Sequence, residues 1–150
     1  MEPSQPSTLT HRLSFASAAL VVLVWPVLSV AHLLVRFFSF QFLEQLLARV
    51  PTILHLSGSR AREWPLAIGY AVHRARRLHV TDVKCLAAAA TCTSLLRLVG
   101  LPATLVIGVR RDPFEAHAWT ELEGGVVGER REHVAQYTPM HRLEQITRLP

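Results

Sequence analysis

The stretch TDVKCLAAAATCTSLLRLVGLPATLVIGVR, residues 81–110, decides the fold class because its pattern changes from helix to strand at one glycine. Thr81 is a good N-cap, and the run after it predicts a helix through Leu98 that Gly100 ends. Three β-like segments follow, with a Gly-Gly turn between the last two: 103–109, 116–122 and 126–127. The tail around Tyr137 has room for one more short strand and a terminal turn. Helices followed by an antiparallel sheet predict an α+β fold.

The chain before this stretch is helical in pattern and divides into unequal parts. Residues 1–12 are polar with two prolines and predict a flexible N-terminus, and residues 13–58 predict a hydrophobic helical region. The loop around Gly58 separates this region from residues 59–150, which we expect to form the functional domain. Within these parts, amphipathic periodicity predicts helices over residues 27–50 and 64–78.

Residues 13–35 carry no formal charge and admit two interpretations. A membrane span needs about 20 apolar residues, so the length allows membrane insertion or tight association with a membrane surface. The serines and the central Pro26 favour instead two buried helices that break at this proline. A signal peptide is not favoured, because little positive charge precedes the segment and no small-residue cleavage site follows it.

Length and composition set limits on the class of protein. The 150 residues and 16.8 kDa suffice for one ordinary domain, and a hydrophobic share of 50% excludes a disordered chain. The net charge of +5 comes from scattered arginines, with Lys84 as the single lysine. We therefore expect no nucleic-acid partner and a weak preference for acidic partners or anionic lipid. Two cysteines do not make a disulfide framework, so we expect a cytoplasmic protein.

Cys85 and His117 are the residues most suited to chemistry. Cys85 is the fourth residue after the expected N-cap, where the helix dipole and free backbone N–H groups stabilise a thiolate. A cysteine at a helix terminus followed by a histidine on a strand is the arrangement that thiol hydrolases use, with the histidine as general base. Cys92, two turns further along the helix, is expected to be a small core residue.

A third group must orient the histidine, and Glu121, Glu123 and Glu129 are the candidates. If the hairpin loop comprises residues 122–124, then His117 lies directly opposite Glu129, with Cβ atoms about 5 Å apart. Glu121 shares the face of His117 but lies about 13 Å along the strand, and Glu123 is in the turn. A register shift of one residue would turn Glu129 away.

Motifs for other chemistry are absent from the sequence. None of the eight histidines falls in an HExxH or CxxC pattern, and we expect neither a metal site nor a cofactor. The sequence also has no Walker loop, no GxGxxG after a strand and no GxSxG.

Several motifs in order resemble one family of enzymes: Cys85-Leu86-Ala87, Gly100-Leu101-Pro102-Ala103, Leu105 to Arg110, His117-Ala118-Trp119 and Val126-Val127-Gly128-Glu129. The block resembles the transglutaminase-like cysteine protease of lasso-peptide biosynthesis. The resemblance is close over residues 60–130, and before residue 60 it is limited to the hydrophobic helical character of the chain.

The resemblance implies a peptidase that removes the leader peptide from a ribosomally synthesised precursor, within a domain spanning residues 59–150. Cys85 then matches the nucleophile and His117 the general base, while Glu129 stands where the family usually has aspartate. The resemblance also implies a separate winged-helix-like leader-recognition protein and a downstream lasso cyclase related to asparagine synthetase.

Two other functions remain open from the sequence. The same fold transfers acyl groups to amines in transglutaminases and arylamine acetyltransferases, and the sequence does not decide between water and an amine as acceptor. A non-enzymatic small helical membrane protein, in which Cys85 and His117 are incidental, is the third possibility.

Overall fold

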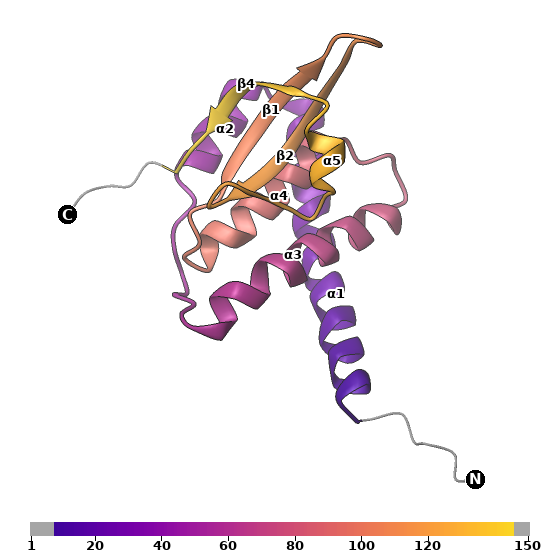
Figure 1. The fold of residues 1–150 in the computed structure, drawn as a ribbon, viewed down its shortest axis with the longest axis vertical. Coiled ribbons are helices and arrows are strands. Elements are labelled where there is room, and N and C mark those ends of the chain that lie inside the picture. The colour runs from indigo at the N-terminus through magenta and orange to yellow at the C-terminus, as the bar shows by residue number, and fades with distance from the viewer. Residues whose placement is uncertain (1–7, 146–150) are drawn as a thin grey trace, which may run out of the picture.

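The computed structural model describes the backbone of residues 8–145, and the side chains of residues 18–58 and 61–145. In chain order the described elements are α1 (Thr8–Phe37), α2 (Phe40–Ala48), α3 (Ser59–Arg77), α4 (Cys85–Leu98), β1 (Thr104–Arg110), β2 (Glu115–Leu122), β3 (Gly125–Val127), α5 (Arg131–Val134) and β4 (Thr138–Leu143). Helices followed by a small sheet confirm the α+β fold (Figure 1). The further strand expected near the C-terminus is β4, and the terminal turn expected after it falls partly on residues 146–150, outside the described part.

The four strands form one antiparallel sheet in the order β3-β2-β1-β4. The turn between β2 and β3 has two residues, Glu123 and Gly124, with φ angles of 51° and 76°. Positive φ at both positions is what a tight hairpin turn with the right-handed strand twist requires, and Gly124 adopts it at no steric cost. The hairpin was expected here with Gly124-Gly125 in the turn, but Gly125 already pairs with Leu122 as the first residue of β3.

Three apolar clusters connect the helices to the sheet. The largest joins α1, α3 and α4, and the second joins α2 and α4 to the inner face of the sheet through Leu105 and Ala118. The third, on the opposite face under α5, comprises Val106, Trp119, Val134 and Tyr137. Helices α2 and α4 therefore cover one face of the sheet, and the four-residue α5 covers part of the other (Figure 1).

Helix α1 differs from the sequence-based expectation because it continues through Pro26. One stripe of α1, namely Val21, Val24, Leu28 and Ala31, is buried at spacings of three and four residues. This packing on α3 and α4 holds the helix together where the local signal predicts a break. The helix begins at Thr8, so residues 8–12 of the expected flexible terminus are helical, and residues 1–7 lie outside the described part.

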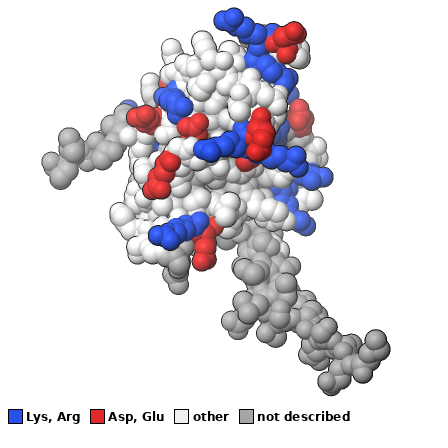
Figure 2. Space-filling view, in the orientation of Figure 1, with Lys and Arg blue, Asp and Glu red and all other residues white. Residues whose placement is uncertain are grey.

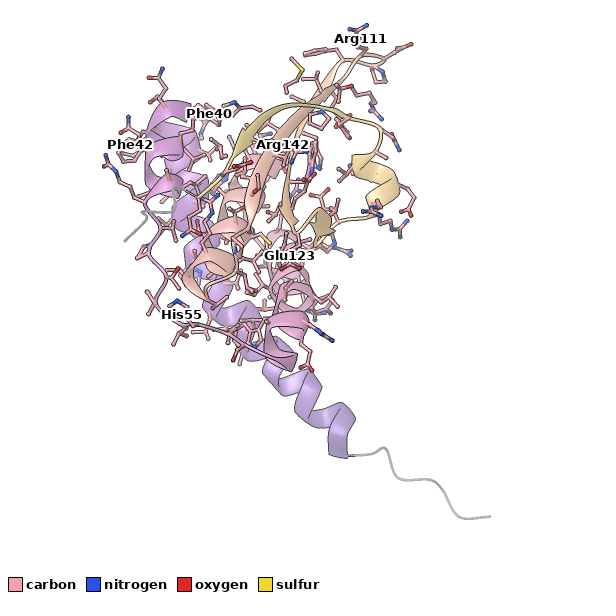
Figure 3. All side chains as sticks on the ribbon, turned by 60° about the vertical axis from the view of Figure 1, so that its left-hand side comes forward. Phe40, Phe42, His55, Arg111, Glu123 and Arg142 are labelled. Carbon is pink, nitrogen blue, oxygen red and sulfur yellow. The ribbon has the colours of Figure 1, made fainter. Side chains whose placement is uncertain are left out.

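The single helix expected over residues 27–50 is two helices. Helix α1 ends at Phe37, and Ser39 starts α2 by accepting a hydrogen bond on its side chain from the Phe42 N–H. A serine is a preferred N-cap, so the chain restarts a helix in a new direction there. The result places Leu43 and Leu47 against the sheet, while Phe40 and Phe42 point outward (Figure 3).

Helix α4 begins at Cys85, not just after Thr81 as the sequence predicted. The N-cap is Lys84, in an extended conformation, and the Thr81 hydroxyl instead lies 3.0 Å from Nδ1 of His79. Because Thr81 uses its hydroxyl in this loop contact, it does not cap the helix. The cysteine is therefore the first residue of the helix, nearer to its N-terminus than expected.

A buried arginine connects α4 to three other parts of the chain. Arg97 is fully buried and donates to the carbonyl oxygens of Leu47, Ala103 and Leu143 at 2.8, 2.8 and 2.6 Å. These oxygens belong to α2, to the segment before β1 and to β4. The guanidinium thereby fixes the helix that carries Cys85 relative to α2 and to the β1 and β4 side of the sheet.

Candidate active site

Cys85 lies at the N-terminal tip of α4, half-buried against β2. Strand β3 pairs only with residues 120–122 of β2, so the part of β2 around Ala118 has an open edge on that side. At the helix tip, the N–H groups of Ala87 and Ala88 bond to the Lys84 carbonyl. The N–H groups of Cys85 and Leu86 precede them and have no backbone acceptor among the described residues.

The environment of Cys85 favours the thiolate. Burial raises the pKa of this thiol, but hydrogen bonds from His117 and from the backbone of Ala118, with the positive charge of His117, outweigh burial and leave the pKa below its ordinary value. A hydrogen bond with the Leu86 backbone acts in the same direction. The sulfur therefore meets a strand backbone, a helix terminus and an imidazole together.

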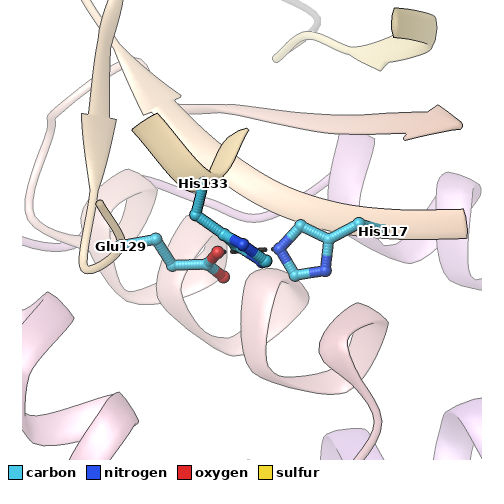
Figure 4. Close-up of side chains that lie close together, drawn as sticks. All are labelled: His117, Glu129 and His133. Atoms are coloured by element: carbon cyan, nitrogen blue, oxygen red, sulfur yellow. Dashed lines mark hydrogen bonds and ion pairs between the residues drawn. The ribbon is translucent and has the colours of Figure 1, made fainter. Parts of the chain in front are cut away.

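His117 is buried on β2, opposite Gly108 of β1. Its Nε2 lies 2.7 Å from Oε2 of Glu129 (Figure 4). Because Nε2 faces the carboxylate, Nδ1 is the ring nitrogen left for the thiol. The structure thus brings together the three residues singled out in the sequence: thiol, imidazole and carboxylate.

Glu129 reaches His117 by a different route from the one expected. The observed register pairs Glu121 with Val126 and Leu122 with Gly125, one residue away from the predicted pairing, which would have turned Glu129 aside. However, β3 ends at Val127, and Gly128 has a φ angle of 78° that bends the chain out of the strand. The carboxylate therefore approaches His117 from a loop after the strand.

A close contact between two glycines fixes this loop. A Cβ atom on Gly69 of α3 would lie 2.7 Å from the Cα of Gly128, so the two backbones touch. Helix α3 supports the residue before Glu129 in this way. Sequence reasoning did not find this contact, because neither glycine lies in a recognisable turn motif.

The other two carboxylate candidates do not contact His117. Glu121 accepts hydrogen bonds from Nε1 of Trp119 at 2.9 Å and from Arg142 at 2.7 Å. Glu123 lies in the hairpin turn, exposed at the end of the sheet near α3 (Figure 3).

The pKa of His117 is raised to about 9 by its hydrogen bonds to Cys85 and to Glu129 and by the negative charges of both, against an opposing effect of burial. The raised pKa of His117 and the lowered pKa of Cys85 both favour an imidazolium beside a thiolate over the neutral pair. In that state Cys85 is already deprotonated and His117 already holds the proton that a leaving amine needs.

Three aromatic rings surround His117 that sequence reasoning did not assign to the site. The ring centroids of Trp119, Tyr137 and His133 lie 6.1, 5.0 and 5.1 Å from that of His117. The Trp119 signal was present in the sequence, two residues along the same strand. Tyr137 and His133 come from α5 and its end, and a four-residue helix leaves no periodic pattern to find.

Cys92 lies apart from this chemistry. The side chain is buried among core residues, and burial raises the pKa of its thiol to about 12. It is the small core residue that the sequence predicted.

A helix that presents a cysteine at its tip to an antiparallel sheet that carries a histidine and a carboxylate defines a papain-like or transglutaminase-like architecture. A comparison with family models agrees, since the model of the transglutaminase-like superfamily matches residues 27–142. The chain belongs to this superfamily, whose members are typically cysteine proteases and acyltransferases. The match begins within α1 and includes the boundary expected at residue 58. The domain boundaries expected from the sequence stay a prediction. Neither the curated proteins nor the solved structures gave a match.

Proposed function

We propose that this protein is a cysteine peptidase that removes the leader peptide from a ribosomally synthesised lasso-peptide precursor. The observation that carries the proposal is the placement of Cys85 as the first residue of α4, where His117 lowers the pKa of its thiol, while Nε2 of His117 lies 2.7 Å from Glu129. No cofactor or metal is needed for this chemistry.

In the proposed reaction the Cys85 thiolate attacks the carbonyl carbon of the scissile peptide bond. The tetrahedral intermediate collapses, the C–N bond breaks, and the proton on His117 passes to the departing amine of the core peptide. A water molecule then gives its proton to His117 and attacks the thioester, which releases the leader carboxylate and restores the thiolate. Glu129 holds the imidazole in place through both halves of the reaction.

The oxyanion of the intermediate requires donors next to the sulfur. The Cys85 N–H is well suited, because it lies at the helix terminus and has no backbone acceptor among the described residues. Such fixed donors stabilise the charge that develops in the transition state. The start of α4 therefore supplies both the nucleophile and part of its oxyanion hole.

A substrate-binding surface lies beside residues 79–83, just before Cys85. A hollow of about 390 Å³ is bounded there by the basic side chains His73, Arg76 and Arg77. The Nε of Arg76 donates to the carbonyl of Val83 at 2.8 Å, which orients the rest of its guanidinium. The carboxylate of Asp82 also lines this hollow, but the basic side chains outnumber it, so this surface favours a peptide with acidic residues.

The identity of the substrate rests on the resemblance of residues 60–130 to the leader peptidases of lasso-peptide biosynthesis. The proposal includes their partners: a separate winged-helix-like protein that recognises the leader, and a cyclase related to asparagine synthetase that acts on the released core. We expect the purified chain to cleave a precursor peptide encoded beside it and to be strongly stimulated by the recognition protein.

The test compares three variants in that assay, read by mass spectrometry. Cys85→Ala and His117→Ala should each abolish leader removal, while Cys92→Ala, the matched cysteine control, should retain it. Cleavage by Cys85→Ala would overturn the proposal. A product in which the leader is joined to an added amine, with no free leader acid, would assign the chain to acyl transfer instead.

For its location we propose the cytoplasm, with α1 in contact with a membrane surface. Ala18–Phe37 is long and apolar enough to span a membrane. However, Val24 and Leu28 belong to the protein core, and a spanning helix would have to leave it. The outer face of the same helix exposes Leu23 and Val30, which suits shallow insertion at an anionic lipid surface.

Sedimentation with anionic lipid vesicles tests this location. The double substitution Leu23→Ser and Val30→Ser should reduce binding, while Leu66→Ser, an equally exposed apolar site on α3, should not. Binding that is equal in all three proteins, or absent from the unaltered chain, would contradict the proposal. Protein that resists alkaline extraction from the vesicles would indicate a spanning helix.

A further inference from the structure

Beside the carboxylate that orients His117 lies a second histidine, which the proposed reaction does not use. His133 is exposed on α5, and one ligand atom from each of His117, Glu129 and His133 lies within 4.8 Å of the others (Figure 4). The rings of the two histidines are nearly perpendicular, with an interplanar angle of 74°. Two imidazoles and a carboxylate are ligands that Zn²⁺ binds with one position left for water.

We propose that His117, Glu129 and His133 form an inhibitory binding site for a divalent transition-metal ion of the zinc type. Zinc–nitrogen and zinc–oxygen bonds of about 2.0–2.2 Å hold ligand atoms nearer to one another than the 4.8 Å that bounds this group, so its wider separations must shorten. The exposed His133 side chain is the member that has room to move. The His117–Glu129 pair, already in contact at 2.7 Å, would open to admit the ion.

The inhibitory effect follows from the two nitrogens of one ring. An ion held by the Glu129 carboxylate takes the nitrogen that faces it, Nε2 of His117. The proton on Nε2 is released to solvent when the metal bond forms, and a neutral ring with metal on Nε2 carries its remaining proton on Nδ1. The proton on Nδ1 then belongs to a neutral ring, which does not release it readily to a leaving amine. The reaction loses its general acid, while the sulfur of Cys85 remains free.

This inference concerns the regulation of the proposed active site and rests on that function, but the test does not require peptidase activity. Zn²⁺ binding is measured by calorimetry on Cys85→Ala, with the visible spectrum of Co²⁺ as a second measurement of coordination. We expect one site without sulfur ligation. The double variant Cys85→Ala, His133→Ala should bind Zn²⁺ about 10-fold more weakly or worse, since even the loss of a residue that only supports a ligand lowers metal affinity about 10–100-fold. His55→Ala, which removes an exposed histidine from the loop between α2 and α3, is the matched control and should leave the Kd unchanged (Figure 3).

A second measurement follows the thiol. In the chain with Cys85 intact, Zn²⁺ at a concentration that saturates the site should leave Cys85 open to alkylation by iodoacetamide, because the ion binds the nitrogen of His117 that faces Glu129 and not the sulfur. Protection of Cys85 by Zn²⁺ would mean that the ion binds the sulfur directly, and the proposal would be wrong. Equal Zn²⁺ affinity in the two histidine variants would also overturn it. If the unaltered protein does not cleave the precursor but these metal results are obtained, only the proposed function is refuted.

Discussion

Glu129 controls how strongly His117 holds its proton. The pKa of His117 is raised to about 9, and the Glu129 carboxylate is one of the two partners responsible. Because the imidazolium is the form that protonates the leaving amine, activity should persist below this pKa and fall as pH rises through it. Glu129→Gln keeps a hydrogen-bond acceptor but removes the charge. We expect the alkaline limb of the kcat/KM profile to move to lower pH, with a loss of about 10²–10⁴-fold at the optimum.

The control for this profile is Glu121→Gln. Glu121 is also a carboxylate of the β2–β3 region, but its partners are Trp119 and Arg142, not His117. The alkaline limb of this variant should remain where the unaltered protein has it. A limb that stays in place in Glu129→Gln, or that moves equally in both variants, would show that the His117–Glu129 contact does not set the protonation of the pair.

The two cysteines should differ sharply in reactivity. Hydrogen bonds from His117 and from the Ala118 backbone lower the pKa of Cys85 despite its burial, whereas burial raises that of Cys92 to about 12. Iodoacetamide at mildly acidic pH should therefore modify Cys85 far faster than Cys92, as read by peptide mass mapping. The Cys85 rate should fall in His117→Ala. Equal slow rates for both cysteines would favour the reading in which Cys85 and His117 are incidental.

At the scale of elements, the sequence predicted which helices and strands exist and in what order better than it predicted where each begins and ends. Gly100 and Gly124 act through their own backbone conformations, so the end of α4 and the hairpin turn were predictable from local signals. The start of α4 was not, because the Thr81 hydroxyl contacts the ring of His79 two residues before it, and a side-chain contact within a loop leaves no pattern in the sequence. The pairing of Glu129 with His117 was predicted for a register that does not occur, and it forms because Gly128 ends the strand.

Contact between α3 and the end of β3 leads to a prediction about Gly69. Alanine normally stabilises a helix relative to glycine by about 1 kcal/mol. Here the new Cβ would lie 2.7 Å from the Gly128 backbone, which no side-chain rotation relieves. Gly69→Ala should therefore lower Tm, reduce kcat/KM and move the alkaline limb in the same direction as Glu129→Gln. Gly125→Ala is the control, because its nearest atom would be 3.4 Å away. A Gly69→Ala protein with raised Tm and full activity would contradict the argument.

At the scale of the whole molecule, the site depends on contacts between segments far apart in the chain. Cys85 comes from a helix, His117 from a strand, Glu129 from a loop and His133 from a four-residue helix. Linear motifs identify the first two, because a helix terminus and a strand each leave a local pattern. The metal-competent grouping around His133 has no such pattern, since its members meet only when the sheet and α5 are assembled. Charged residues are likewise interleaved on the surface, with arginines next to carboxylates, as Figure 2 shows for one face.

A single substitution at Arg97 should lower the stability of the assembled molecule strongly. Its guanidinium serves three carbonyls from α2, the segment before β1 and β4, and all three contacts are buried. Arg97→Met has similar length but no donor, so three buried hydrogen bonds are lost at about 1 kcal/mol each. We expect unfolding free energy to fall by about 3 kcal/mol and Tm by about 6–12 °C. The matched control is Arg142→Met, which removes an exposed pair with Glu121 (Figure 3) and should cost at most about 1 kcal/mol. Equal Tm values for the two variants would mean that water replaces the guanidinium, and that Arg97 does not hold α4 against the sheet.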